Sequence, residues 1–348
     1  MDDAGEALDR AVAILRGGGL VALPTETVYG LGANALDPSA VARIFAAKER
    51  PAWDPVIVHI AGSSQDPVQG AAMLASLVSE IPAAAQRLMD AFWPGPLTLL
   101  LPRSAAVPDA VTAGRPLVGV RMPSHPVALE LIRRAQVPVA APSANRFGRI
   151  SPTTAEHVLE DLDGRIDAVL DAGPTVHGVE STVLDPGPSP MIVYRPGAIT
   201  AAEIQAVAGA VEVFEDGGKL EQTPRQARPS PGVGLRHYAP RAELVLVRGP
   251  LGRIGRKVAR LAETAYGVPD EKLGIMLPDE IAPPVRGAEI YPWGRWSAPD
   301  ELARNLYAGL RELDARGCTV ILCPWPPGEG IAVAIRDRLL KAATPAKE

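Results

Sequence analysis

Cysteine is nearly absent from this sequence, which has only Cys318 and Cys323 in 348 residues. The two do not form a C-x-x-C pair and no histidine lies nearby, so the pattern fits neither a zinc site nor a redox motif. Residues five apart on a strand point to opposite faces, which argues against a disulfide. We therefore expect two buried structural thiols.

Long apolar runs, a P-loop and an excess of positive charge are missing as well. No apolar run approaches the roughly 20 residues that cross a bilayer, and the acidic start, with Asp2, Asp3 and Glu6, lacks the basic region of a secretory signal. The motif G-x-x-x-x-G-K-[ST] does not occur. A formal net charge of -5 argues against binding nucleic acid through global charge. We expect a cytoplasmic protein with no membrane partner and small anionic substrates.

The apolar residues instead switch repeatedly between helical and strand periodicity. Up to about residue 210 this pattern predicts a mixed α/β domain with a twisted sheet. The predicted helices are 7–15, 40–47, 127–134 and 155–162, and the predicted strands are 20–23, 56–60, 97–101, 117–120, 137–141, 168–170 and 191–194. Further on, strands 244–247, 273–277 and 319–322 alternate with helices 253–264, 300–315 and 330–342. This second pattern predicts a smaller, doubly wound, Rossmann-like α/β domain.

The chain is too long for one compact domain of typical size. Residues 215–241 interrupt the periodicity with several glycines, prolines and arginines. We predict a catalytic domain at 1–211, a linker at 212–241 and a C-terminal domain at 242–348. The aromatic and basic residues near the end of the linker are typical of a segment that docks, so we expect residues 229–238 to close over the first domain as a lid.

The richest segment is Leu23-Pro24-Thr25-Glu26-Thr27-Val28-Tyr29-Gly30-Leu31-Gly32, where a strand runs into a turn rich in hydroxyl groups. Its end also fits the dinucleotide fingerprint G-x-G-x-x-A. That fingerprint requires a helix to start immediately after the glycines. The predicted helix starts only near Pro38, which disfavours a dinucleotide site.

Two further segments carry groups that suit phosphate. Lys48-Glu49-Arg50-Pro51 ends a predicted helix, and cations there can simply complement the helix dipole. Ala141-Pro142-Ser143-Ala144-Asn145 follows an apolar strand and presents a hydroxyl and an amide two residues apart. Together with a lysine and an arginine, these donors fit phosphate oxygens.

These segments together resemble the signature of the Sua5/YrdC/YciO family. Further blocks appear in that family's order: Val58-His59-Ile60, Trp93-Pro94-Gly95-Pro96-Leu97-Thr98, Val120-Arg121-Met122-Pro123, Gly178-Val179-Glu180-Ser181-Thr182 and Arg195-Pro196-Gly197. Arg236-His237-Tyr238-Ala239-Pro240 and the domain after it resemble Sua5, the two-domain form. The resemblance therefore covers nearly the whole chain.

The resemblance implies an L-threonylcarbamoyladenylate synthase, a nucleotidyltransferase. Such an enzyme converts L-threonine, bicarbonate or CO2, and ATP into threonylcarbamoyl-AMP, pyrophosphate and water, the first step of the t6A37 modification of tRNA. Mg²⁺ is expected to arrive with the ATP phosphates, without a metal site in the protein. The implied partners are the downstream proteins that transfer the group to tRNA, and contact with tRNA itself is expected to be weak or indirect.

The same resemblance implies the roles of individual residues. Lys48 and Arg50 are the expected catalytic residues. The threonine contacts are Thr27, His59, Arg121, Ala141 and Ser181. The ATP contacts are Lys48, Arg50, Asp54, Leu117, Ser143, Asn145, Ser151, Arg195 and Arg236. Asp54 and Leu117 depart from the family's usual residues, because an acidic group near phosphates requires a metal or cation beside it and a leucine can contribute only its backbone.

Two alternatives remain open. Related domains in hydrogenase maturation factors and antibiotic carbamoyltransferases adenylate carbamoyl groups, but this chain lacks the cysteine pairs and the length of the extra modules. An RNA-binding protein would show an affinity that falls steeply with salt. The acidic net charge, and the lack of arginines and lysines clustered among aromatic residues, count against it.

Overall fold

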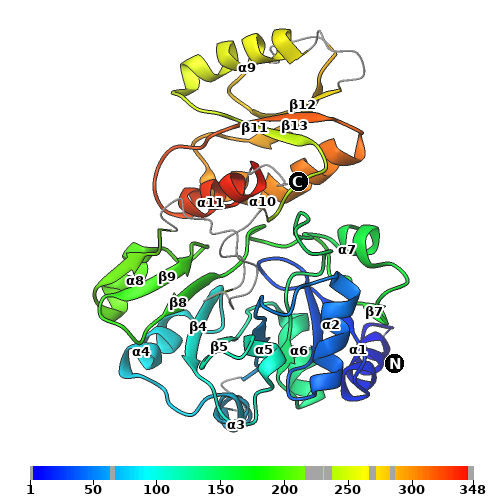
Figure 1. Cartoon of the computed structure of the whole chain (residues 1–348), viewed down its shortest axis with the longest axis vertical. Helices are drawn as coiled ribbons and strands as arrows, with labels where there is room; N and C mark the ends of the chain where they lie inside the picture. The colour runs from blue at the N-terminus through cyan, green and yellow to red at the C-terminus, as the bar shows by residue number, and fades with distance from the viewer. Residues whose placement is uncertain are drawn as a thin grey trace. The chain divides into compact units, whose positions relative to one another are not determined.

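The computed structural model describes residues 3–62, 67–215, 230, 237–265, 272–282 and 287–343 (Figure 1). By its contacts the chain forms two compact units. The first comprises Met1–Phe147, Pro152–Val176 and Glu180–Gly234, and the second comprises Gly148–Ser151, His177–Val179 and Leu235–Glu348. The predicted boundary at residue 211 falls on a strand, β10 (Val211–Val213), which pairs with the preceding strand of the first unit.

The first unit is built on a mixed ten-stranded sheet with the strand order β10-β9-β8-β4-β5-β3-β6-β2-β1-β7. Its strands are β1 (Val21–Leu23), β2 (Gly30–Asn34), β3 (Ile57–His59), β4 (Leu97–Pro102), β5 (Leu117–Arg121), β6 (Val139–Ala140), β7 (Ala168–Val169), β8 (Thr182–Asp185), β9 (Met191–Arg195) and β10. Its helices are α1 (Asp3–Arg16), α2 (Pro38–Lys48), α3 (Pro67–Leu77), α4 (Ala83–Phe92), α5 (Asp109–Thr112), α6 (Pro126–Ala135), α7 (Ala155–Leu162) and α8 (Ala201–Ala208).

The strands in the middle of this sheet separate a hydrophobic core from a polar face. Val58, Val120, Leu99 and Leu184 are fully buried and belong to the main core. Successive residues of a strand point to opposite faces of the sheet. The residues next to these four along their own strands therefore face the other side. On that other side, polar side chains share the face with a small apolar cluster of Ile57, Leu100 and Val183, and the sheet thereby positions the candidate site.

Helix α2 shows how the sequence fixes one edge of that site. Asp37 is its N-cap, with Oδ1 accepting hydrogen bonds from the backbone N–H groups of Ser39 and Ala40, and Pro38 occupies the first turn. The helix ends at Lys48, and Glu49 adopts a left-handed conformation with φ 55°. This C-terminal turn sets the position of Lys48 and of Arg50 after it.

The second unit has a four-stranded parallel sheet in the order β11-β14-β12-β13. Its elements are β11 (Glu243–Val247), α9 (Leu251–Ala265), β12 (Leu273–Pro278), β13 (Glu289–Gly294), α10 (Pro299–Ala315), β14 (Val320–Pro324) and α11 (Ile331–Ala343). Figure 1 shows α9 on one side of this sheet and α10 and α11 on the other. The predicted doubly wound α/β architecture is thus confirmed, as is the mixed α/β fold of the first unit.

Each strand and helix predicted from the periodicity is present in the structure, with bounds that differ by a few residues at most. It missed β2, β8, β10 and β13, and the helices α3, α4, α5 and α8. Strand β13 contains Pro292, which cannot donate to a sheet and is tolerated here because β13 lies at the sheet edge. None of the helices in the described ranges is long and apolar enough to cross a membrane.

The prediction that Cys318 and Cys323 are buried and unpaired is confirmed. The expected reason was partly wrong, because Cys318 precedes β14 and only Cys323 lies on the strand. The backbone N–H of Cys318 instead bonds to the carbonyl of Leu313, in the turn after α10. Burial raises the pKa of both thiols, which keeps them protonated.

Candidate active site

The polar face of the first sheet gathers side chains from five adjacent strands. His59 ends β3 directly opposite Arg121 at the end of β5. Thr98 lies on β4, Ser181 precedes β8, and Arg195 ends β9. All five side chains are buried, with at most 5% of their surface exposed. Burying so many polar groups together is costly unless they have partners, which marks this face as a site rather than a core.

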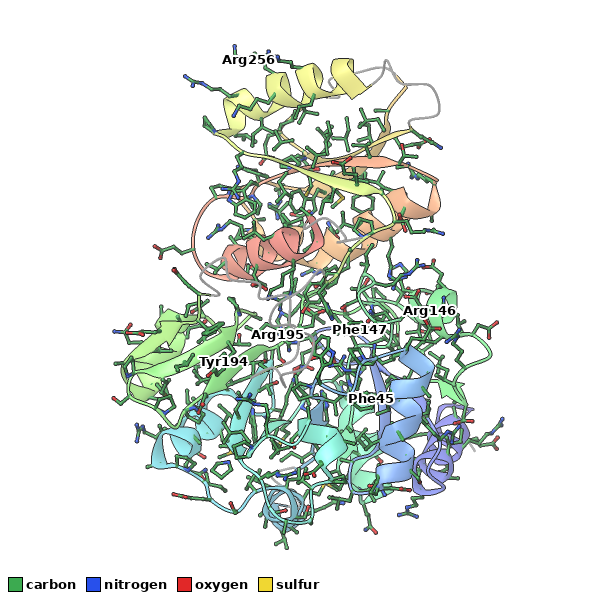
Figure 2. All side chains as sticks on the ribbon, in the orientation of Figure 1. Phe45, Arg146, Phe147, Tyr194, Arg195 and Arg256 are labelled. Atoms are coloured by element: carbon green, nitrogen blue, oxygen red, sulfur yellow. The ribbon has the colours of Figure 1, made fainter. Side chains whose placement is uncertain are left out.

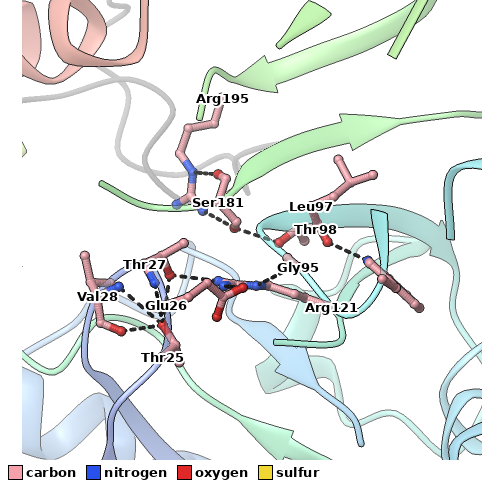
Figure 3. A network of polar contacts seen from close by, with 11 residues as sticks. Thr25, Glu26, Thr27, Val28, Gly95, Leu97, Thr98, Arg121, Ser181 and Arg195 are labelled. Carbon is pink, nitrogen blue, oxygen red and sulfur yellow. Dashed lines mark hydrogen bonds and ion pairs between the residues drawn. The ribbon is translucent and has the colours of Figure 1, made fainter. Parts of the chain in front are cut away.

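The guanidinium of Arg121 is the centre of this group (Figure 3). Its Nε donates to the carbonyl of Gly95 at 3.1 Å, and its Nη1 donates to Thr27 Oγ1 at 2.9 Å. Its Nη2 lies 2.6 Å from Oε1 of Glu26, and both side chains of this ion pair are at most 5% exposed. Thr27 is held in turn by Thr25 Oγ1 at 2.9 Å. The turn 24–29 therefore brings three polar side chains to the end of β5.

Several buried polar atoms in this group have no hydrogen-bond partner. They are Nη2 of Arg121, both carboxylate oxygens of Glu26, and Nδ1 of His59. The contact between Arg121 and Glu26 is a close ion pair that lacks the angular geometry of a hydrogen bond. Buried polar atoms are nearly always paired in native proteins. A cation and an anion that pair with each other but keep hydrogen-bonding capacity, next to an imidazole nitrogen without a hydrogen bond, are suited to a small zwitterionic ligand.

Electrostatics fixes the charge states of these groups. Burial opposes ionisation of Glu26, but the neighbouring Arg121 outweighs burial and holds the pKa of this carboxyl below its usual value. Burial, reinforced by Arg121, lowers the pKa of His59 to about 3. At neutral pH the site therefore holds a carboxylate, a guanidinium and a neutral imidazole that can accept a hydrogen bond.

A second cluster continues the site across β4, β8 and β9. Arg195 donates through Nη2 to Ser181 Oγ at 3.1 Å and through Nε to the Ser181 carbonyl at 3.1 Å. Ser181 Oγ also lies 2.8 Å from Thr98 Oγ1. Gly197 permits this arrangement, because a Cβ there would stand 2.3 Å from the backbone nitrogen of Thr182. The Arg195-Pro196-Gly197 block therefore holds Arg195 against Ser181.

A third cluster forms where α2 ends. The ammonium group of Lys48 donates to the carbonyls of Ser143 and Asn145, and the side chain is only 1% exposed. Lys48 is thus not a solvent-exposed partner of the helix dipole. Burial and the nearby Arg50 lower the pKa of Lys48 well below its usual value. The structure brings Lys48, Ser143 and Asn145 together as the resemblance implied.

Arg50 and Asp54 form a buried ion pair beside this cluster. Arg50 Nη2 lies 2.9 Å from Asp54 Oδ2, and both side chains are 4% exposed. Arg50 also donates to the carbonyls of Asp54 and Pro55, at 3.1 and 2.7 Å. The acidic Asp54 is therefore compensated by a cation of its own segment.

The strand pair β3 and β5 connects the two ends of the site. Leu117 begins β5 and lines a small cleft with Pro55, the residue after Asp54. Arg121 ends the same strand, four residues or about 13 Å further on. Ala141 lies between the ends, with its N–H bonded to the carbonyl of Ile57 at 2.9 Å. Arg50, Asp54 and Leu117, which are expected to contact ATP, thus lie toward the opposite end of this strand pair from His59 and Arg121, which are expected to contact threonine. Arg195, also an expected ATP contact, instead lies against Ser181, an expected threonine contact.

Two expected contacts are not brought into this group. Ser151 is fully buried, but it belongs by its contacts to the second unit. Arg236 and most of the predicted lid lie outside the described residues. Tyr238, two residues after Arg236, is packed within the second unit. The centre of its ring lies 5.8 Å from that of Tyr307 and 5.2 Å from the Arg338 guanidinium.

A larger cavity of about 630 Å³ lies on the other side of β3 and β5. It is lined mainly by apolar residues, among them Ile60 and Met122, which follow His59 and Arg121 and alternate to the opposite face. Its lining does not include the unpaired polar atoms described above. The polar face, and not this cavity, is therefore the candidate active site.

Sequence reasoning missed two members of the site. Glu26 was quoted within its motif but given no role, and Thr98 was quoted in the same way. A carboxylate between two threonines on a turn is the signal that could have identified Glu26. Its pairing with Arg121 depends on β1 and β5 lying in one sheet, which no local pattern reveals.

Comparison with known proteins places the chain among characterised relatives. A Sua5/YciO/YrdC family model, described as telomere recombination, matches residues 13–197, and a model described as the C-terminal domain of threonylcarbamoyl-AMP synthase matches residues 199–344. The threonylcarbamoyl-AMP synthase of Pyrococcus abyssi is 43% identical over 96% of this chain and 93% of its own, and that of Bacillus subtilis is 43% identical over 96% and 92%. The solved structure of P. abyssi Sua5 complexed with L-threonine is similar with a TM-score of 0.87, at 41% identity, over 99% of this chain and 95% of that one.

Proposed function

Because the chain belongs to the Sua5/YciO/YrdC family and has the two-domain Sua5 form, we propose that it is a threonylcarbamoyl-AMP synthase whose active site is the polar face of the first sheet. The reaction joins L-threonine, bicarbonate or CO2 and the AMP part of ATP, with release of pyrophosphate and, when bicarbonate is used, of water. The buried ion pair of Glu26 and Arg121, next to the His59 imidazole, is the single observation that carries this assignment.

Threonine fits these atoms group by group. Its carboxylate matches Nη2 of Arg121, and its amine matches the carboxylate of Glu26. The neutral Nδ1 of His59 can accept the hydroxyl hydrogen of threonine, and Thr27 already supports Arg121 from the side. Every polar group of a zwitterionic hydroxy amino acid then finds a partner in a water-poor site. Ala141 and Ser181 complete the proposed threonine contacts.

The chemistry then proceeds along the strand pair toward its nucleotide end. The threonine amine attacks CO2 with loss of a proton, or bicarbonate with loss of water, to give a carbamate, and a carbamate oxygen then attacks the α-phosphorus of ATP while pyrophosphate leaves. Lys48, Arg50 and Arg195 are the cations that we propose stabilise the negative charge developing on the phosphates. Ser143 and Asn145 lie at this nucleotide end as well, because their backbone carbonyls accept hydrogen bonds from Lys48. Ser151, Asp54, Leu117 and Arg236 remain proposed nucleotide contacts.

Mg²⁺ is proposed to enter with ATP. Among the residues that the structure describes, no three carboxylate, imidazole or thiol groups come together as a metal site. Mg²⁺ commonly binds to substrate phosphates and water with few protein ligands. The ion would neutralise phosphate charge next to the proposed cations. The product would pass to proteins that transfer the threonylcarbamoyl group to tRNA.

The test is direct synthesis by the purified full chain. We would mix it with ATP, Mg²⁺, bicarbonate and ¹⁴C-threonine and follow pyrophosphate release together with the labelled adenylate. Arg121→Lys keeps the charge but loses the planar fork, so kcat/KM for threonine should fall roughly 10- to 150-fold, the value of one charged hydrogen bond of about 1.5–3 kcal/mol. Arg133→Gln, on the exposed surface of α6, is the matched control and should leave the rate unchanged. Pyrophosphate release that does not depend on threonine would refute the assignment.

A further inference from the structure

Thr98 is a fully buried threonine on the polar face, and the proposed reaction gives it no role. It lies on β4, between β5 and β8. Its methyl group packs over Gly119 of β5, where a Cβ would lie 3.4 Å from Thr98 Cγ2. Its Oγ1 lies 2.8 Å from Ser181 Oγ (Figure 3). A β-branched side chain has few rotamers, so this packing holds the hydroxyl toward Ser181.

The hydrogen-bonding capacity of Ser181 is almost fully used. A serine hydroxyl accepts two hydrogen bonds and donates one. Arg195, at the end of β9 (Figure 2), donates to one acceptor position through Nη2 and holds the Ser181 carbonyl through Nε. In the part of the chain that the structure describes, Thr98 Oγ1 has no hydrogen-bond partner except Ser181 Oγ. The two hydroxyl hydrogens therefore share a single contact, and one of them has no acceptor.

The hydrogen without an acceptor belongs to Ser181. If Ser181 donated to Thr98, the Thr98 hydrogen would be buried inside the sheet, where an unsatisfied donor is costly and no ligand reaches it. Ser181 instead precedes β8 and lies beside the Arg195 cation, which attracts an anionic oxygen. When Thr98 donates, both acceptor positions of Ser181 are filled, and the Ser181 hydrogen is directed toward such an oxygen.

Ser181 stands where the two substrates meet. It is a proposed threonine contact, and Arg195, which is bonded to it, is a proposed cation for the phosphates. In threonylcarbamoyl-AMP, the group that joins threonine to the α-phosphate is the carbamoyl group. A ligand oxygen between a threonine contact and a phosphate contact is therefore an oxygen of the carbamate.

Building on the proposed function, we infer that Thr98 is a positioning residue of this reaction. Its hydroxyl donates to Ser181, and the Ser181 hydroxyl thereby donates to the carbamate oxygen that does not attack phosphorus. A hydrogen bond to a charged oxygen is stronger than one between neutral groups. It holds the carbamate, which otherwise reverts to CO2 and the amine, until the α-phosphate is attacked.

The experiment measures initial rates of labelled threonylcarbamoyl-AMP synthesis by the full chain, with bicarbonate, threonine and ATP varied one at a time. Thr98→Val keeps nearly the same shape but removes the donor. Its kcat/KM for bicarbonate should fall roughly 2- to 13-fold, the value of one neutral hydrogen bond, whereas KM for threonine and for ATP should change less than about twofold. Thr98→Ser keeps the hydroxyl and should retain the wild-type rate. The matched control is Thr182→Val, because Thr182 is also fully buried but donates to the Ile199 carbonyl at 2.6 Å; its kcat/KM for bicarbonate should be unchanged.

A double-variant cycle separates positioning from packing. Ser181→Ala removes the group through which Thr98 acts, so adding Thr98→Val to it should lower kcat/KM for bicarbonate no further. Additive losses, an unchanged rate in Thr98→Val, or equal falls for all three substrates would overturn the inference. If Thr98→Val does not fold, Thr98→Ala compared with Thr98→Ser measures the same hydroxyl. A wild type that makes no threonylcarbamoyl-AMP would instead refute the proposed function, so the two failures are distinguishable.

Discussion

Replacing Glu26 with glutamine tests the proposed threonine site most sharply. The change keeps the size of the side chain but removes the negative partner of Arg121, which lies 2.6 Å away in a pair at most 5% exposed. Removing one member of a buried ion pair typically costs 3–5 kcal/mol, because the other charge stays buried without compensation. Glutamine retains an oxygen that can accept from Arg121, so we expect a loss near the lower limit, about 3 kcal/mol in the free energy of unfolding.

The same substitution should also weaken the use of threonine. Loss of a charged hydrogen-bond acceptor for the threonine amine corresponds to about 1.5–3 kcal/mol, or roughly a 10- to 150-fold fall in kcat/KM for threonine. The KM for ATP should change little, because Glu26 lies at the other end of the strand pair. Urea unfolding and steady-state pyrophosphate release measure the two effects. Glu130→Gln, which removes a carboxylate held by two surface arginines, should lose about 1 kcal/mol or less and keep wild-type kinetics. A destabilised Glu26→Gln with unchanged kcat/KM for threonine would show that Glu26 has only a structural role.

Further substitutions test the charge states and the packing of the site. Because the unfolded chain protonates His59 below about pH 6.5 and the folded chain only near pH 3, acid should favour unfolding, by about 2 kcal/mol between pH 6.5 and 5. His59→Gln should remove this slope in urea titrations at each pH, and an unchanged slope would mean that His59 is not the group responsible. Lys48→Met should leave the carbonyls of Ser143 and Asn145 without their donor and lower kcat for pyrophosphate release at least roughly 10²-fold; a rise in KM for ATP alone would assign Lys48 to binding only. Gly32→Ala should destabilise the fold by about 1–3 kcal/mol in thermal or urea unfolding, because its Cβ would stand 2.7 Å from Leu23 Cδ2 and 2.9 Å from Val139 Cγ1, and a wild-type stability would disprove this tight packing.

The two glycines of the richest motif show what local sequence can and cannot predict. Gly30-Leu31-Gly32 matched a dinucleotide fingerprint, and the absence of an immediate helix argued against that function. The structure agrees, since both glycines lie within β2 and the next helix begins at Pro38. The actual reason for Gly32 is close packing against side chains of β1 and β6. That reason depends in part on β6, which is far from the motif in sequence, so the motif alone could not supply it.

The candidate site likewise contains residues that the sequence identified and contacts that it could not predict. Lys48, Ser143 and Asn145 were grouped through a family resemblance, and the structure brings them into contact. The elements that were missed follow a physical pattern: β2 is rich in glycine, β10 is exposed, and β13 contains a proline, so none shows strong apolar alternation. The pairing of Glu26 with Arg121 joins residues 95 positions apart, and sequence periodicity carries no information about such contacts.

The alternation of side chains along β3 and β5 explains why stability and chemistry are inseparable in this site. Val58 and Val120 pack into the main core, and the next residue of each strand, His59 and Arg121, presents a polar group to the opposite face. A shift of one residue in the register of either strand would exchange the two sets, burying charge in the core and exposing valine to substrate. The hydrophobic core therefore fixes the register, and the register fixes the distance between the proposed threonine and nucleotide ends. It follows that a core substitution such as Val120→Ala should impair catalysis to the extent that it loosens β5, even though Val120 faces away from every proposed substrate contact.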